Sequence, residues 1–340
     1  MIAAFCTQPG SFELRDIERP AVGAGEALVK IRSCGICGSD VHFFHGGFAP
    51  PPVCPGHEIS GEVAEVGPGV TLQRGDRVAV EPLIVCRRCP YCRAGNYQLC
   101  QESRLLGTTV NGGFAEYLRM PASALFLLPA EVDFTVGALT EPLAVAVHAV
   151  RLAGVQLSHR VLVIGGGTIG LMAVAAARAA GAADVWISAR YPQQSRAAES
   201  LGATHVFSGA GASRAAAAAA SEQPIDVVIE TVGGTADTLT EALQLARPGG
   251  TIAVLGLFAN TAALDVFSLV VRELRVVGSL TYGRAGLSAD FDIALQLLAA
   301  QPERFRQLIT HAEPLQEITR GFAIAADKRS GAIKVAIRPE

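Results

Sequence analysis

The sequence predicts an α/β protein with two domains: a mostly β domain, and a domain built on a doubly wound parallel sheet. At roughly 150 residues per domain, a chain of 340 residues accommodates about two domains. Short apolar runs separated by Gly and Pro dominate the first 125 or so residues, whereas strand and helix patterns alternate after about residue 140. Alternating strands and helices are typical of a parallel sheet covered on both faces.

In the first domain we expect strands at ALVKIRS, GEVAEVG, DRVAVEP and AEYLRM, because these runs are apolar and bounded by turn residues. The tail contains a helical pattern, ADFDIALQLLAA, and a last strand pattern, GAIKVAIRP. It is too short to stand alone, so we expect it to pack back onto the first domain. The predicted domains are therefore residues 1–147 with 283–340, and residues 148–282.

The second domain opens with the strand pattern RVLVI, and further strand patterns follow at ADVWIS, THVFS, DVVIET, GTIAVLG and LRVVGS. An alanine-rich stretch, residues 209–221, interrupts this series. Because alanine has the highest helix propensity, we expect a surface helix there.

Composition restricts the function. The chain has 28 Lys+Arg against 31 Asp+Glu, a net charge of −3 and 50% hydrophobic residues. This composition excludes a mainly disordered chain. The net charge gives no general attraction to nucleic acid or membranes, which favours a small-molecule partner. The N-terminus lacks a secretory pattern and charges interrupt every long apolar stretch, so we expect a cytoplasmic protein whose eight cysteines are metal ligands or buried thiols.

The strongest motif is C-x2-C-x2-C-x7-C, formed by Cys86, Cys89, Cys92 and Cys100. For this cysteine content the spacing has a chance probability on the order of one in 10⁵. Four thiolates in one short loop can close a tetrahedral shell around Zn²⁺, which leaves no position for a substrate. The motif therefore predicts a structural zinc site.

A second cluster lies upstream, in CGICGSDVH with Cys37 and in PGHEISG with His57 and Glu58. One Cys, one His and carboxylates brought together by the fold would form an open zinc site with a position for a substrate oxygen. A single histidine is more often a core or turn residue, and spacing alone does not show that the two segments meet.

A glycine motif follows the strand RVLVI. Gly165, Gly167 and Gly170 form G-x-G-x-x-G between this strand and an apolar helix. In that setting the glycines let the backbone approach a pyrophosphate at a helix N-terminus, so the motif predicts dinucleotide binding over an ordinary glycine turn.

The end of the next strand bears on the choice of dinucleotide. An NAD site has an Asp or Glu there for the ribose hydroxyl, but this chain has Ser188, Ala189 and Arg190. A guanidinium beside a hydroxyl suits a 2′-phosphate, which predicts NADP(H) over NAD(H). The alternative is that Arg190 stacks on the adenine or faces solvent.

Together these motifs resemble the zinc-containing medium-chain alcohol dehydrogenases, in their polyol (sorbitol) and threonine dehydrogenase branch, over essentially the whole chain. The resemblance implies a GroES-like catalytic domain and a Rossmann cofactor domain. It also implies a catalytic zinc held by Cys37 and His57, with Glu58 as a ligand in the polyol branch and Glu141 beside the metal. Simple alcohol dehydrogenases have a Cys near the position of Glu141, and its absence here favours the carboxylate-rich branch.

The resemblance also implies individual roles. Ser39 and His42 match a proton relay, although a helix N-cap and a partly exposed histidine are the alternatives. Asp40 would orient His57. Further cofactor contacts would come from Thr168, Ile169, Leu255, Gly256 and Leu257, with Thr281 near the nicotinamide.

The expected function is a zinc-dependent oxidoreductase, with one catalytic and one structural zinc, that transfers a hydride between NADP(H) and a secondary alcohol or polyol. Phe43, Phe44 and His45 are candidate pocket walls, with core positions as the alternative for the two phenylalanines. The strand pattern LRVVGSLT resembles the edge strand through which family members pair, which implies a homodimer or homotetramer.

Two other functions stay open. An NAD-dependent L-threonine 3-dehydrogenase, or an NAD-linked polyol dehydrogenase, is the alternative within the family. A zinc- and NADP-binding redox sensor without turnover belongs to another class, and a proton relay through Ser39 and His42 argues against it because a sensor needs none.

Overall fold

The structure is a computed structural model that describes residues 1–46 and 51–339, and these form two compact units. Unit 1 contains Met1–Glu141 together with the segment that starts at Gly283, and unit 2 contains Pro142–Tyr282. The first division falls between Glu141 and Pro142, near the start of helix α4 (Thr140–Leu152), rather than between Val147 and His148.

Unit 1 is built on a seven-stranded sheet with the order β18-β19-β3-β4-β5-β9, in which β8 also pairs with β3. Its strands include the expected apolar runs, and they are β3 (Glu26–Gly35), β4 (Glu58–Val66), β5 (Arg77–Val80), β8 (Tyr117–Pro121), β9 (Leu125–Leu127), β18 (Ile309–Pro314) and β19 (Lys334–Arg338). Because inward-facing side chains such as Val29 and Ile31 are buried, the sheet forms one wall of the unit 1 core.

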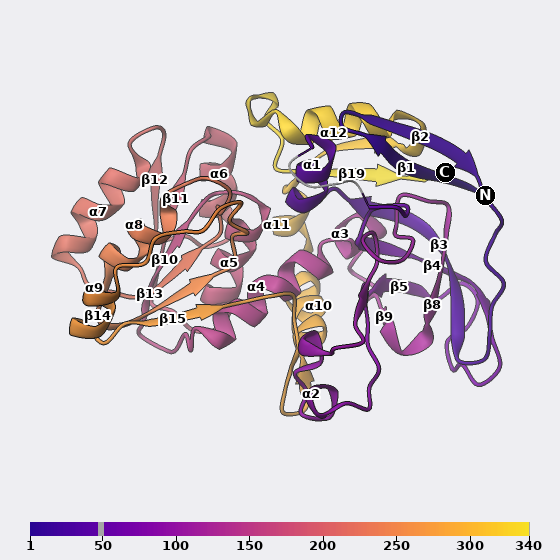
Figure 1. Ribbon diagram of the computed structural model, residues 1–340, viewed down its shortest axis with the longest axis horizontal. Helices are drawn as coiled ribbons and strands as arrows, with labels where there is room; N and C mark the ends of the chain where they lie inside the picture. The colour runs from indigo at the N-terminus through magenta and orange to yellow at the C-terminus, as the bar shows by residue number, and fades with distance from the viewer. Residues whose placement is uncertain (47–50, 340) are drawn as a thin grey trace. The chain divides into compact units, whose positions relative to one another are not determined.

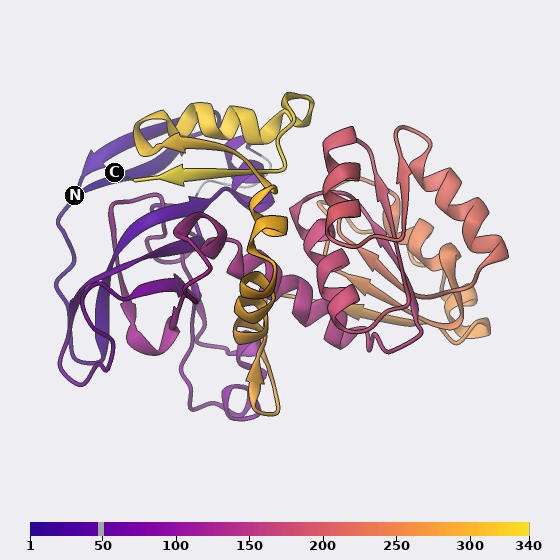
Figure 2. The ribbon, with the colours of Figure 1, turned by 180° about the vertical axis from the view of Figure 1, so that it is seen from behind.

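The tail joins this sheet. Strand β19 pairs antiparallel with β3, so that Ile337 lies opposite Cys34. Helix α12 (Ile318–Ala326) packs against β19 and against β2 (Ser11–Asp16), which forms a hairpin with β1 (Ile2–Gln8). In Figures 1 and 2 the yellow tail lies beside the indigo N-terminal strands. Residues about 300 positions apart in the sequence therefore become neighbours.

Apart from an 11-residue helix that begins at Asp290, the other elements of unit 1 are short. They are α1 (Gly38–Phe44), β6 (Leu83–Ile84), α2 (Pro90–Arg93), η1 (Tyr97–Leu99), β7 (Arg104–Leu105), η2 (Ala122–Ala124), α3 (Phe134–Gly137), β16 (Arg284–Ala285), β17 (Ser288–Ala289), α10 (Asp290–Ala300), α11 (Pro302–Arg306), η3 (Leu315–Glu317) and η4 (Lys328–Ser330).

Unit 2 is a six-stranded parallel sheet with the order β12-β11-β10-β13-β14-β15. The strands are β10 (Arg160–Ile164), β11 (Asp184–Ala189), β12 (His205–Ser208), β13 (Ile225–Glu230), β14 (Ala246–Val254) and β15 (Arg275–Gly278). The chain starts in the middle, moves outward to β12 and returns to β13. This doubly wound order confirms the predicted Rossmann arrangement.

Helices lie on both faces of this sheet, as Figures 1 and 2 show. Helices α5 (Thr168–Ala179) and α6 (Pro192–Ser200) contact each other, and α7 (Ala212–Glu222) contacts α8 (Thr238–Leu245). The alanine-rich stretch forms α7, a helix with mostly exposed residues, as its propensity predicts. A last helix, α9 (Val266–Val271), precedes the edge strand β15.

Among the described residues, the structure contains no helix with the length and apolar character needed to cross a bilayer.

Candidate active site

The four cysteines of the spaced motif come together in one loop of unit 1. The sulfur atoms of Cys86, Cys89, Cys92 and Cys100 all lie within 4.8 Å of one another. Cys86 and Cys92 have their sulfurs 3.9 Å apart, close to the roughly 3.8 Å expected between sulfurs on a tetrahedral zinc with Zn–S bonds of about 2.3 Å. The donor set and its spacing therefore fit a structural zinc ion.

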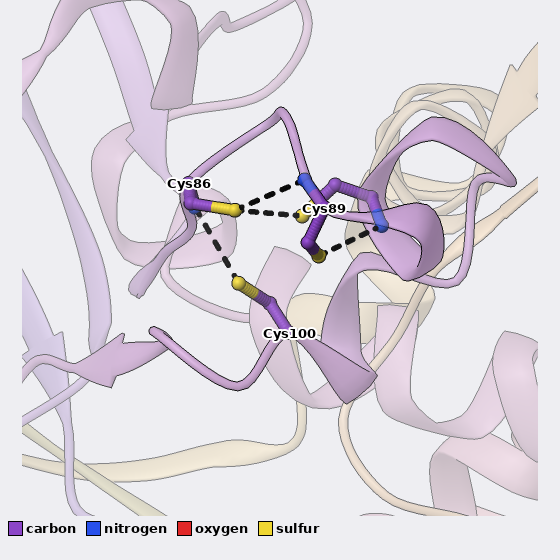
Figure 3. Close-up of side chains that lie close together, drawn as sticks. Cys86, Cys89 and Cys100 are labelled. Atoms are coloured by element: carbon purple, nitrogen blue, oxygen red, sulfur yellow. Dashed lines mark hydrogen bonds between the residues drawn. The ribbon is translucent and has the colours of Figure 1, made fainter.

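Backbone N–H groups support the thiolates of this loop. The N–H of Cys89 donates to Sγ of Cys86 at 3.3 Å, and the N–H of Cys86 donates to Sγ of Cys100 at 3.5 Å; Figure 3 shows these contacts. Backbone hydrogen bonds, first from Arg88 and then from Cys89, lower the pKa of the Cys86 thiol to about 7. At Cys86 the loop thus favours the deprotonated sulfur that a metal requires, whereas burial raises the pKa of the Cys92 thiol to about 12.

The second cluster also assembles. Donor atoms of Cys37, His57 and Glu58 lie within 4.8 Å of one another. Cys37 immediately precedes α1, whereas Glu58 begins β4 directly after His57, so the fold brings together two segments whose meeting the sequence did not show. Three donors of these types are one fewer than a closed tetrahedral shell needs, which fits an open zinc site.

Asp40 lies next to Cys37 and His57 of this cluster. Its Oδ2 accepts a hydrogen bond from the N–H of Cys37 at 3.1 Å, and its Oδ1 lies 3.8 Å from Nδ1 of His57. Oδ1 is buried and has no hydrogen-bond partner among the described residues. The carboxylate therefore faces the ring that it was expected to orient, at a separation slightly longer than a hydrogen bond.

Electrostatics make the cluster attractive to a cation. Burial disfavours a charged His57, but the negative charges of Asp40 and Cys37 outweigh it and raise the pKa of the imidazole well above its usual value. Burial raises the pKa of Asp40, although His57 opposes this. Several anionic groups thus share one buried region, a situation that a divalent cation relieves.

Glu141 lies near this cluster without joining its inner group. It is buried in the first turn of α4, and burial raises its pKa to about 7, with His57 opposing and Glu58 reinforcing the shift. Its carboxylate is not among the donor atoms that lie within 4.8 Å of one another. Its electrostatic interaction with His57 and Glu58 indicates that Glu141 lies near this donor group without belonging to it.

Glu58 has a partner that the sequence analysis missed. Nζ of Lys334 lies 2.6 Å from both carboxylate oxygens of Glu58 and 3.0 Å from the carbonyl oxygen of Ile36. In the sequence, this ion pair is indicated only by a lysine inside the apolar strand pattern of the tail. Its contact with Glu58 depends on the pairing of β19 with β3.

Helix α1 carries the two candidate proton-relay residues and one residue of the hydrophobic core. Ser39 is half-buried and His42 is exposed, three positions apart and so on one face of the helix. The N-cap is Cys37, so the alternative in which Ser39 caps the helix is wrong. Phe44 is buried and packs on Phe322, which makes it a core residue rather than a pocket wall.

In unit 2 the glycine motif occupies the turn between β10 and α5. Gly165 has φ +108°, a conformation that favours glycine. A Cβ on Gly170 would lie 1.8 Å from the carbonyl oxygen of Gly165, so the helix can approach the strand only with glycine there. Gly167 caps α5, and Thr168 and Ile169 form its first turn. The backbone thus has the form that receives a pyrophosphate.

A cavity of about 570 Å³ opens beside this turn. Its walls include Ser188 and Arg190, together with Gly165, Gly166, Gly167 and Gln194. Ser188 Oγ accepts a hydrogen bond from the N–H of Gly165 at 3.3 Å. Oε1 of Gln194 accepts from the N–H of Arg190 at 3.1 Å and thereby fixes the start of this segment. Gln194 was not identified from the sequence.

Glu230 organises the neighbouring turns and was also missed. This fully buried side chain accepts hydrogen bonds at Oε1 from the N–H groups of Val232 and Gly233 and from the hydroxyl of Thr238, at 2.7–2.9 Å. Its backbone carbonyl accepts from Leu255 and Gly256, two of the expected cofactor residues. The segment Leu255–Leu257 and the loop that lines the cavity are therefore held together.

Thr281 was expected near the nicotinamide. It follows β15 with φ +51°, which is unusual for a β-branched residue. Its hydroxyl is buried and makes no hydrogen bond within the described part of the chain. An unsatisfied hydroxyl on a strained backbone fits a ligand-binding position.

Comparisons with known proteins agree with these features. The family description "alcohol dehydrogenase GroES-like domain" matches residues 23–130, and "zinc-binding dehydrogenase" matches residues 168–300. Sorbitol dehydrogenase of Bacillus subtilis (strain 168) is 32% identical over 100% of this chain and 97% of its own length. L-threonine 3-dehydrogenase of Symbiobacterium thermophilum is 33% identical over 96% and 94%. A solved structure from Sinorhizobium meliloti 1021, bound to NADP, has a TM-score of 0.89 and 35% identity, with 99% of both chains covered.

Proposed function

The chain belongs to the zinc-containing medium-chain alcohol dehydrogenases, in the group that includes polyol dehydrogenases, and we propose that it transfers a hydride between NADP(H) and a secondary alcohol or polyol. The observation that carries the proposal is the open donor group of Cys37, His57 and Glu58. A carboxylate in place of a second thiolate makes a harder Lewis acid and leaves room for two substrate oxygens, which suits a vicinal diol.

The side chains of unit 1 would bind two zinc ions. Cys37 and His57 would hold the catalytic zinc, with Glu58 and Glu141 as further oxygen donors, and the four-cysteine loop would hold the structural one. Zinc in the open site would act as a Lewis acid on the substrate oxygen, and a bound nicotinamide would accept the hydride.

The proton of the substrate hydroxyl would leave through α1. Ser39 Oγ would accept it, and His42, on the same helix face and exposed to solvent, would release it to water. Asp40 would keep His57 oriented through the carboxylate that faces Nδ1.

Arg190 supports the preference for NADP(H). It lines the cavity beside the glycine turn together with Ser188, and no carboxylate stands at the end of β11 to accept from a ribose hydroxyl. The related structure from Sinorhizobium meliloti, bound to NADP, supports the same choice.

Parallel titrations of NADPH and NADH, followed by nucleotide fluorescence, test the cofactor. We expect tighter binding of NADPH, and we expect Arg190→Ala to remove most of that difference. Arg196→Ala is the matched control, because Arg196 is exposed on α6 and does not line the cavity. Equal or tighter binding of NADH by the wild type would refute the NADP(H) assignment.

The substrate class is tested by a screen of polyols, 2,3-butanediol, simple secondary and primary alcohols and L-threonine with both cofactors. We expect oxidation of secondary alcohols or polyols with NADP⁺. The alternative, an NAD-dependent L-threonine 3-dehydrogenase, is supported by the Symbiobacterium thermophilum relative. Oxidation of L-threonine with NAD⁺ would favour this alternative. Activity with primary alcohols alone would overturn the polyol proposal, and no turnover with any substrate would favour the sensor.

We also propose that the chain forms at least a homodimer in the cytoplasm. Strand β15 lies at the sheet edge, and the adjacent α9 exposes Phe267 and Val270 by 77% and 67%. An unpaired edge beside exposed apolar side chains favours pairing with a second copy. Light scattering of wild type and Phe267→Asp tests the oligomeric state. We expect a dimer or tetramer that the substitution weakens, and a monomeric wild type would exclude the proposed dimer.

The eight free thiols support a reducing compartment, which fits the proposed cytoplasmic location.

A further inference from the structure

Gln194 is a buried polar residue that contacts two segments of the dinucleotide cavity. It is 7% exposed and lines the cavity beside the glycine turn. Its Oε1 accepts hydrogen bonds from the backbone N–H groups of Arg190 at 3.1 Å and of Tyr191 at 3.2 Å. A Cβ built on Gly166 would lie 3.0 Å from the same oxygen. The side chain therefore holds the segment that carries Arg190 and packs closely against the glycine turn.

These contacts form the start of helix α6. Tyr191 is the N-cap, and Gln194 is the third helical residue, whose side chain reaches back to the N-cap N–H. Glutamate and glutamine both serve at this position, because either offers an oxygen acceptor. A carboxylate would accept the two N–H groups more strongly than an amide and would suit the positive end of the helix dipole. The helix alone thus favours glutamate, and the neutral residue needs another reason.

The charge of the cavity wall supplies that reason. Among the described residues that line the cavity, Arg190 is the only one with an ionisable side chain. Its guanidinium carbon lies 5.8 Å from the centroid of the Tyr191 ring, and it forms no ion pair within the described part of the chain. The wall is therefore positive. A glutamate at position 194 would add a carboxylate to this wall, which would offset the charge of Arg190 and repel a phosphate.

We propose that Gln194 is a specificity-determining residue for NADP(H): its neutral amide holds the backbone of Arg190 and keeps negative charge out of the cavity wall, so that a 2′-phosphate binds there. The inference rests on the proposed function, since it presupposes a nucleotide in this cavity. It adds a residue that acts on the choice of nucleotide without itself supplying a charge to the phosphate. A purely structural capping role would be served at least as well by glutamate.

Gln194→Glu tests the inference, because it preserves the oxygen acceptor and adds only charge. The test measures binding rather than turnover: NADPH and NADH are titrated by nucleotide fluorescence, and 2′,5′-ADP and ADP by calorimetry. We expect the ratio of the affinities for NADPH and NADH to fall about tenfold, because the added carboxylate repels the 2′-phosphate. The ratio for 2′,5′-ADP and ADP should fall likewise. Both effects should become smaller as the salt concentration rises.

Two further variants separate the charge from the helix cap. Gln193→Glu is the matched control, because it adds the same charge to the same helix turn at a residue that does not line the cavity, and it should change the NADPH to NADH ratio by less than about twofold. Gln194→Ala removes the acceptor without adding charge. Its ratio should fall less than that of Gln194→Glu, whereas its free energy of unfolding should be the lower of the two.

Several outcomes would overturn the inference. An unchanged ratio in a folded Gln194→Glu protein would do so, as would an equal loss of affinity for both nucleotides or a larger fall of the ratio in Gln194→Ala. If Gln194→Glu does not fold, Gln194→Asp, which also places a carboxylate in this wall, is measured with the same expectation. A wild type that binds NADH as tightly as NADPH would instead refute the NADP(H) assignment of the proposed function, and the inference with it.

Discussion

Unit 1 contains two groups of metal-ligand side chains that are built in opposite ways. The four-cysteine loop is local: its donors lie between Cys86 and Cys100, and three of the four are only half-buried. The group of Cys37, His57 and Glu58 is assembled from separate segments, has Glu58 as its one fully buried member, and is bordered by Asp40 and by Lys334 of the last strand.

The difference follows from what each group has to do. A shell with four protein ligands satisfies a zinc ion completely, so a short loop with backbone N–H donors is enough to hold it. A shell with an open position has to resist collapse and exclude unwanted ligands, and this requires surrounding residues that fix each donor. The closed shell therefore depends little on the fold, and the open one depends on it strongly.

The largest expected effect follows from removing a ligand of the open site. Cys37→Ser should lower kcat/KM at least about a thousandfold, or about 4 kcal/mol, because the metal is lost or misplaced. The far-ultraviolet circular dichroism and the zinc of the four-cysteine loop should be retained. Turnover near the wild-type rate would show that the two groups do not differ in function.

The closed shell should respond in the opposite way. Cys92→Ser should reduce the free energy of unfolding by about 2–4 kcal/mol, because the loop loses its metal. We expect kcat/KM per folded molecule to fall far less than for Cys37→Ser. Denaturant unfolding and steady-state kinetics on the same preparation measure both quantities, and a loss of activity without a loss of stability would contradict the comparison.

The same contrast explains what the sequence could predict. The cysteine loop and the glycine turn are local patterns, in which spacing fixes which atoms meet, and both assemble as expected. The pairing of Cys37 with His57 depended on the resemblance to known enzymes, because the two lie on different elements. The parallel sheet was predictable because alternating strands and helices admit few other folds.

Contacts between distant segments could not be predicted. Lys334 reaches Glu58 only because the last strand pairs with β3, and a single lysine in an apolar pattern does not reveal its partner. Glu230 lies in the strand pattern DVVIET, which does not reveal that its side chain accepts hydrogen bonds from the turn that follows the strand. Phe44 enters the core because helix α12 supplies Phe322, and Cys37 replaces Ser39 as the helix cap.

The link between the cysteine loop and the sheet provides a pH-dependent test. Tyr97, from η1 in this loop, donates a hydrogen bond to Oε1 of Glu81 at 2.5 Å, directly after β5. Burial raises the pKa of Glu81 to about 7 from 4.5, although the Tyr97 hydrogen bond opposes this shift. The folded state therefore binds the proton more tightly than the unfolded state does, and stability from this group falls as pH rises from about 4.5 to about 7.

Glu81→Gln should remove this slope. Between pH 5 and pH 8 the free energy of unfolding of the variant should gain about 3 kcal/mol relative to wild type, as an upper value. Glu102→Gln is the matched control, because Glu102 is exposed and pairs with Arg88 on the surface of the same loop. If the free energies of unfolding of wild type and Glu81→Gln depend on pH in the same way, Glu81 does not couple the four-cysteine loop to the sheet. The loop would then be independent of the sheet, as its local ligands suggest.

Asp40 provides the smallest and most selective test of the comparison. Asp40→Asn keeps an oxygen that can accept from the N–H of Cys37 but removes the negative charge 3.8 Å from Nδ1 of His57. Because loss of such an outer partner typically costs about 10–100-fold in metal affinity, the open site should release zinc to a chelator at correspondingly lower concentrations. The four-cysteine loop is the control within the same molecule, since its sulfurs are supported by their own backbone N–H groups, and its zinc should be released as in the wild type. A variant in which both ions are released more easily would mean that Asp40 supports unit 1 as a whole. Release confined to the open site would mean that the fold holds this metal through its second layer of contacts, which the closed shell does without.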